Sequence, residues 1–122
     1  MLATSIPDEV RKAQMILRIL TPDEYFVIDD SQAIQSLEHA MEVLDELPEP
    51  LYQQFAKPDK NDFAIWIRHT IGDHDLATAV EMTAHDRKEL IRRLEARIAY
   101  LEQLLDDIAG QLSLEEQLYQ AQ

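Results

Sequence analysis

Histidine and aspartate residues are concentrated in one short interval of the chain, where they could ligate a metal ion. This interval contains His69, Asp73, His74, Asp75, His85 and Asp86. Imidazole and carboxylate groups are good ligands for zinc, iron and manganese. The adjacent His-Asp pairs at 74–75 and 85–86 are similar to those of metal-dependent phosphohydrolases. The candidate metal ligands are His69, His74, Asp75 and His85, and the matching function is a small metal-dependent hydrolase or regulator.

A simpler interpretation assigns the same residues to helix ends. Asp73 precedes a segment with helical spacing and can cap it, and Asp86 falls in the first turn of a later helix. The di-iron helical pattern, a Glu followed three residues later by a His, is absent. Glu81 and His85, for example, are four residues apart. We therefore expect surface or capping histidines, and no cofactor.

Other sites of catalysis find no support in the sequence. The chain has no cysteine, which excludes disulfides, thiolate metal sites and cysteine nucleophiles. Its two glycines, Gly72 and Gly110, are too far apart for a phosphate-binding loop. No serine lies in a nucleophile elbow. Phe63 and Trp66 lie one helical turn apart and are expected to form core rather than a ligand pocket. An enzyme is therefore less expected than a binding protein, and no catalytic residue is predicted.

The composition indicates one folded, acidic domain. The chain has 122 residues, of which 46% are hydrophobic, and its formal net charge is -13. That length and apolar fraction suit a single globular core. The negative charge disfavours nucleic acid and anionic membranes as partners. No apolar run approaches the roughly 18 residues that span a bilayer, and the first residues lack the pattern of a secretory signal. We expect a cytoplasmic protein.

Proline residues and polar caps divide residues 1–83 into short helices that form one bundle domain. The expected helices cover residues 7–20, 31 or 36 to 47, 50–57, 62–71 and 73–82. The β-branched and aromatic segment at 25–30 is too short for a sheet and is predicted to be an extended connector across the helices. Gly72 is placed as a left-handed helix C-cap.

A long amphipathic helix is predicted in residues 84–122, as part of the same structural unit. Its apolar residues alternate spacings of three and four over three heptads: Ile91, Leu94, Ile98, Leu101, Leu105, Ile108 and Leu112. From Asp86 to Ala109 this helix would be roughly 36 Å long, more than a small bundle can cover. A capping box at Ser113 predicts that a short terminal helix restarts after Gly110.

The order of charges along this helix favours self-pairing. The bases come first, at Arg87, Lys88, Arg92, Arg93 and Arg97, whereas residues 100–122 hold five acids and no base. This order opposes the helix macrodipole, but an antiparallel pair would set each basic half against an acidic half. We predict an antiparallel homodimer through the seven seam residues.

Three alternatives for this helix stay open. The seam can pack on the first helix of its own chain. The basic half can dock on an acidic stretch between Arg18 and Lys57, which has nine acids and no base, in its own or a neighbouring chain. The basic half can also contact nucleic acid in a transcription-associated factor, although the bases have no interleaved aromatic residues.

One signature in the first part of the chain is similar to that of a known family. The segment 61–68 reads N-D-F-A-I-W-I-R, and Ile71-Gly-Asp, Leu76-Ala77 and, upstream, Tyr25-Phe-Val and Ser36-Leu-Glu accompany it. This pattern resembles a small all-α domain of unknown function found in many archaeal and some bacterial proteins. The resemblance covers roughly residues 22 to 82 and implies a helical fold but no activity. The family's usual glycine after the extended segment is replaced here by Asp30-Ser31.

These observations predict an all-α bundle of short helices with a long, coiled-coil-like C-terminal helix. The function they favour is a non-enzymatic protein–protein interaction or assembly module that forms a homodimer.

Overall fold

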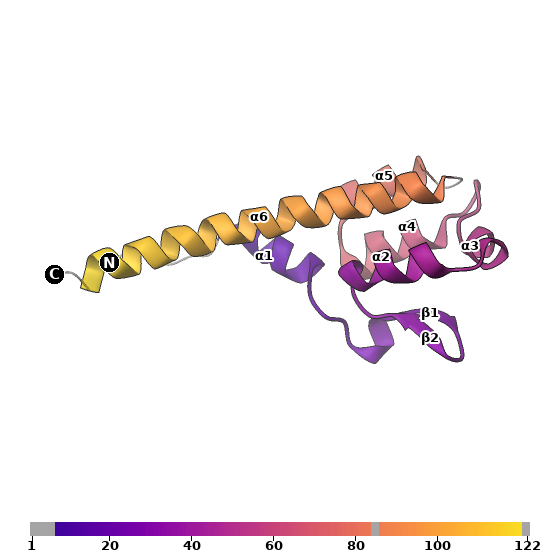
Figure 1. The fold of residues 1–122 in the computed structure, drawn as a ribbon, viewed down its shortest axis with the longest axis horizontal. Helices are drawn as coiled ribbons and strands as arrows, with labels where there is room; N and C mark the ends of the chain where they lie inside the picture. The colour runs from indigo at the N-terminus through magenta and orange to yellow at the C-terminus, as the bar shows by residue number, and fades with distance from the viewer. Residues whose placement is uncertain (1–6, 84–85, 121–122) are drawn as a thin grey trace.

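The computed structural model describes residues 7–83 and 86–120. Helices dominate these residues, and the longest one extends beyond the others at one end of the molecule (Figure 1). The elements are α1 (Asp8–Ile16), the 3-10 turn η1 (Pro22–Glu24), β1 (Phe26–Asp29), β2 (Gln32–Ile34), α2 (Leu37–Glu46), α3 (Glu49–Phe55), α4 (Asp62–Trp66), the π-helical turn η2 (Ile67–Ile71), α5 (His74–Glu81) and α6 (Arg87–Gln120). The mostly helical fold with a long C-terminal helix is confirmed.

A small β hairpin corrects the prediction of a purely α-helical fold. β1 and β2 pair antiparallel, with Phe26 opposite Ile34. Asp29 Oδ1 closes the turn by accepting hydrogen bonds from the backbone N–H and the hydroxyl of Ser31, at 2.8 and 2.9 Å. The extended backbone at 25–30 was predicted, but its pairing was not. Residues 32–34 also fit the helical spacing of the next helix, and this hid the second strand.

Local sequence sets several helix ends, as predicted. Ser36, Asn61 and Asp73 each accept a hydrogen bond from the backbone N–H three residues further on, at 3.0, 3.2 and 3.1 Å. Such side-chain caps satisfy backbone donors that the first helical turn leaves unpaired. Gly72 follows η2 with φ of 91°, the left-handed conformation that favours glycine. These ends fix the positions of α2, α4 and α5.

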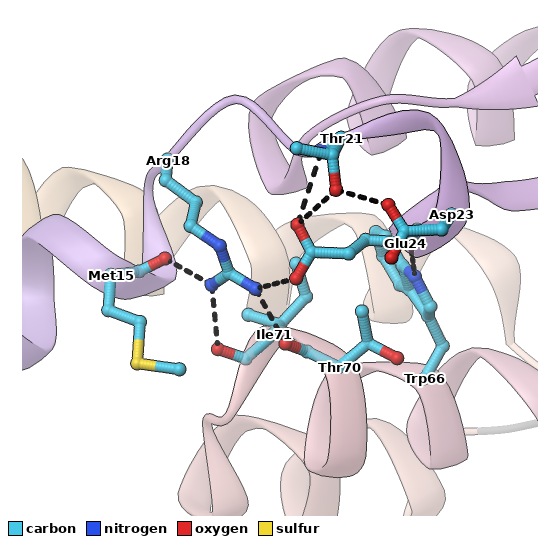
Figure 2. A network of polar contacts seen from close by, with 8 residues as sticks. All are labelled: Met15, Arg18, Thr21, Asp23, Glu24, Trp66, Thr70 and Ile71. Carbon is cyan, nitrogen blue, oxygen red and sulfur yellow. Dashed lines mark hydrogen bonds and ion pairs between the residues drawn. The ribbon is translucent and has the colours of Figure 1, made fainter.

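The first helix ends earlier than predicted because Arg18 binds elsewhere. Its guanidinium donates to the backbone oxygens of Met15 at 2.6 Å and Thr70 at 2.9 Å, and it pairs with Glu24 Oε2 at 2.8 Å (Figure 2). These contacts join the end of α1, η1 and η2. The chain therefore turns after Ile16 instead of continuing as helix to Leu20.

Phe63 and Trp66 of α4 form part of the core, as predicted, and Phe26 of the hairpin packs against them. The Phe26 ring centroid lies 4.9 Å from that of Phe63 and 5.8 Å from that of Trp66. Trp66 is 8% exposed, and its indole N–H donates to the backbone oxygen of Glu24 at 2.9 Å (Figure 2). The hairpin is thus held against α4 by ring packing and one hydrogen bond.

The last helix is continuous, which corrects the predicted break at Gly110. α6 extends from Arg87 through Gly110 to Gln120. Among the described residues, only Gly72 has the positive φ that a left-handed helix end requires. A glycine inside a helix costs only about 1 kcal/mol relative to alanine. The strong helix formers on both sides of Gly110 offset that cost.

Candidate functional site

The first half of α6 belongs to the core of the molecule. It packs against α1, α2 and α5. Leu90, Leu94, Ile98 and Leu101 are at most 3% exposed. Three of the predicted interface residues, Leu94, Ile98 and Leu101, are therefore covered by helices of the same chain. This matches the alternative in which the seam packs within its own chain, with α2 and α5 contributing as well as α1.

The C-terminal end of α6 extends away from the body (Figure 1), and we call residues 102–120 the overhang, of which Leu104 and Leu105 at its start still pack against the core. At 1.5 Å per residue the overhang is roughly 28 Å long. Leu104, Leu105 and Ile108 are half-buried there. Of the other predicted interface residues, Ile91 is half-buried beside the core, and the side chain of Leu112 lies outside the described part. Along α6, this apolar face thus changes from buried to half-buried.

Arg87 is committed to contacts inside the chain. Its guanidinium donates to the backbone oxygens of Leu44 at 3.0 Å and Leu47 at 2.5 Å, and it pairs with Glu49. It also lies 4.8 Å from the ring centroid of Tyr52. Burial raises the pKa of Tyr52 to about 12, although the charge of Arg87 opposes this. Arg87 therefore serves as the cap of the α2 C-terminus.

Arg97 is committed in the same way. Its Nε donates to Asp73 Oδ2 at 2.7 Å. The Asp73 side chain is 1% exposed and that of Arg97 is 24% exposed. Because Asp73 also caps α5, this ion pair joins α6 to the N-terminus of α5. The guanidinium carbon of Arg97 lies 5.6 Å from the ring centroid of Tyr100.

Three of the five predicted bases remain exposed on α6: Lys88, Arg92 and Arg93. Arg92 and Arg93 pair with Glu89 on the same helix, at 3.3 and 3.1 Å. Exposed pairs of this kind contribute little to stability. The basic half therefore offers three bases to a partner, fewer than the sequence suggested.

The start of the overhang is crowded with negative charge. Glu102 and Asp106 are exposed on α6. Partial desolvation, followed by the charge of Glu38 on α2 and that of Asp106, raises the pKa of Glu102. Negative charge is therefore concentrated where α2 meets the start of the overhang.

The predicted metal ligands do not gather into a site in the described part of the chain. His69, His74 and Asp75 are exposed, and His85 lies outside the described residues. The described residues hold no group of three or more His, Asp or Glu side chains that could bind a metal ion. Asp86 caps α6 by accepting a hydrogen bond from Glu89 N–H at 3.1 Å. The metal-dependent hydrolase or regulator stays a prediction with no supporting geometry here.

A pocket of about 220 Å³ lies between α1, α5 and α6, next to the start of the overhang. Its lining consists of Glu9, Lys12, Ala13, Ile16, Asp75, Arg97, Tyr100, Leu101 and Leu104. The volume is below the range of about 300 to 1,000 Å³ that is usual for small-molecule sites, and it fits one or two side chains. The heptad pattern missed Tyr100 and Leu104. Their spacing of four residues from each other and from Ile108 was the available signal.

No protein-family model matches this chain, and no curated protein or solved structure matches it. The resemblance of residues 22 to 82 to a small all-α domain therefore stays a prediction. None of the helices in the described residues is long and apolar enough to cross a membrane.

Proposed function

We propose that this protein is a non-enzymatic protein–protein interaction module that self-associates through the overhang as an antiparallel, coiled-coil-like homodimer. One observation carries the proposal. Leu101 is 3% exposed, whereas Leu105 and Ile108, on the same face, are only half-buried. An apolar face that continues beyond the body of a protein is typical of a protein interaction site.

The spacing on the overhang favours another helix as the partner. Leu105, Ile108 and Leu112 follow one another at intervals of three and four residues. This is the spacing of a two-stranded coiled-coil seam. A second copy presents the same seam, and a two-fold axis across it makes the two surfaces complementary. Self-association therefore needs no feature beyond those of this chain.

The charges favour the antiparallel arrangement. Residues 100–122 contain five acids and no base, so a parallel pair would place these acids side by side. An antiparallel pair directs each overhang toward the half of α6 that carries the exposed bases Lys88, Arg92 and Arg93. Arg87 and Arg97 add little to this attraction, because they are engaged within their own chain.

Light scattering coupled to gel filtration tests the proposal on the full chain. The wild-type protein should have twice the chain mass of 14.1 kDa at concentrations of tens of micromolar. Ile108→Glu should return the mass of one chain with an unchanged circular dichroism spectrum. Ala96→Glu is the matched control, since it adds the same charge on an exposed side of the same helix, and it should remain a dimer.

Two outcomes would overturn the proposal. A wild-type protein that stays monomeric at these concentrations has no self-association to explain. A dimer that Ala96→Glu dissociates, and Ile108→Glu does not, uses the opposite face of α6.

A further inference from the structure

We infer that the pocket between α1, α5 and α6 binds a free α-amino acid with an aliphatic side chain. The pocket is lined by residues of one chain, so this site is independent of the self-association proposed above. Its volume, its apolar surface and the charges of both signs that line it each match such a ligand.

The volume of the pocket limits the size of the ligand. At about 220 Å³, the pocket equals the space of roughly seven water molecules at about 30 Å³ each. Drug-sized ligands usually occupy at least about 300 Å³, so a nucleotide or a helical segment of a partner is too large. A free amino acid with a side chain the size of valine or leucine fits this space.

The apolar part of the lining matches an aliphatic side chain. Ala13 and Ile16 of α1 and Leu101 of α6 line the pocket and are at most 3% exposed. Leu104 is half-buried and Tyr100 is 59% exposed, so these two residues form its edge. An aliphatic group placed against the buried residues loses its contact with water, which the hydrophobic effect favours.

Charged groups of both signs converge on the pocket from different helices. Glu9 and Lys12 reach it from α1, and Asp75 reaches it from α5. None of these three side chains makes an ion pair within the described residues. A zwitterionic amino acid carries both complementary charges: its ammonium group can pair with Glu9 and Asp75, and its carboxylate can pair with Lys12.

Arg97 offers a second contact for the ligand's carboxylate. Asp73 accepts hydrogen bonds from its Nε at 2.7 Å and from its Nη2 at 3.3 Å. A guanidinium has more donors than these two bonds use. The buried carboxylate of Asp73 and the ring of Tyr100 hold Arg97 in place at the pocket. Little conformational freedom is therefore lost when a carboxylate binds to its remaining donors.

The balance of charges disfavours small ligands of a single sign. Asp73 already offsets the charge of Arg97, so the other charges at the pocket are those of Glu9, Asp75 and Lys12. An inorganic anion would be repelled by the two carboxylates, and a simple cation would be repelled by the lysine. A zwitterion avoids both repulsions, because it presents each of its charges to groups of the opposite sign.

Isothermal titration calorimetry with the full chain tests the class of ligand. L-leucine and L-valine should bind with dissociation constants below about 1 mM. 4-Methylpentanoate lacks the ammonium group of leucine and 3-methylbutylamine lacks its carboxylate, and each should bind at least about tenfold more weakly than L-leucine. If neither amino acid binds, or if either analogue binds as tightly as L-leucine, the inference is wrong.

Two matched pairs of exposed α1 residues test the contacts. Lys12→Met should weaken L-leucine binding at least about tenfold and reduce the preference for L-leucine over 3-methylbutylamine. Glu9→Gln should reduce the preference for L-leucine over 4-methylpentanoate. Arg11→Met and Asp8→Asn make the same changes at neighbouring residues that do not line the pocket, and both should bind L-leucine as the wild type does. Equal losses within either pair would overturn the assigned contacts.

Binding by a monomeric variant separates this site from the proposed function. Ile108 does not line the pocket, so Ile108→Glu should bind L-leucine with the wild-type dissociation constant. Loss of binding in this variant would show that the site needs a second copy, contrary to the inference. A monomeric wild-type protein that binds L-leucine refutes the proposed function and retains this site, whereas a dimer that does not bind amino acids does the reverse.

Discussion

The two halves of α6 have the same apolar spacing but different surroundings. Leu94 and Ile108 occupy equivalent positions two heptads apart. Leu94 is 0% exposed, whereas Ile108 is half-buried. The difference arises because α1, α2 and α5 bury the first half of α6 more completely than the second, where Leu104 and Leu105 are the residues that still pack against the core within the described part. Periodicity therefore predicts that a helix face will be buried, and it does not say which chain buries it.

The basic residues of α6 show the same contrast. Arg93 and Arg97 lie one turn apart. Arg93 is exposed and pairs with Glu89 on its own helix, whereas Arg97 holds the buried carboxylate of Asp73. Arg97 is one of the bases whose order predicted dimer pairing. Its ion pair with Asp73 shows that it contributes to packing within the chain.

The largest predicted effect separates the two halves of the seam. Leu94→Glu should reduce the free energy of unfolding by more than about 4 kcal/mol, because it places an unpaired carboxylate in the core. Ile108→Glu makes the matching change at the equivalent position and should change the stability of the folded monomer by less than about 1 kcal/mol. Urea denaturation followed by circular dichroism measures both. Equal losses would show that the overhang is as much a part of the core as the first half.

An intermediate effect is predicted at the ion pair between α5 and α6. Asp73→Ala should lower the free energy of unfolding by roughly 2–4 kcal/mol, because it removes a helix cap and leaves Arg97 without its partner. Asp73→Asn keeps a capping oxygen and should lose less. Arg93→Ala, on the exposed side of the same helix, should change stability by less than about 0.5 kcal/mol. A comparable loss of unfolding free energy for Arg93→Ala would contradict the distinction between Arg97, which pairs with a buried carboxylate, and the exposed Arg93.

The smallest predicted effects concern the two glycines and have opposite signs. Gly110→Ala should stabilise α6 by about 0.5–1 kcal/mol, because alanine is the better helix former and the added Cβ meets no atom within 4 Å apart from its own stretch of helix. Gly72→Ala should destabilise the protein by roughly 1–2 kcal/mol, because Gly72 has a φ of 91°. Thermal unfolding measures both shifts. Destabilisation by Gly110→Ala would support the helix break that the sequence predicted.

Local interactions explain the parts of the fold that could be predicted from the sequence. Ser36, Asn61 and Asp73 were expected as caps, and each bonds a backbone N–H only three residues away. The aromatic residues were expected in the core because large apolar rings at helical spacing are seldom left exposed. The hairpin was missed because the pairing of β1 with β2 depends on which short segments come together. The early end of α1 was missed because Arg18 binds Thr70, 52 positions away.

For α6, too, some properties could be predicted from the sequence and others could not. The length of α6, its continuous apolar face and its acidic last part could be predicted from the sequence, since these properties depend on residue type and helical spacing. The sequence did not reveal that Leu94, Ile98 and Leu101 belong to the core while Leu105 and Ile108 are half-buried. The physical reason is that burial depends on where distant helices end. α1 and α2 lie far from α6 in the sequence, and where they pack on it Leu94, Ile98 and Leu101 are buried, whereas Ile108 is only half-buried.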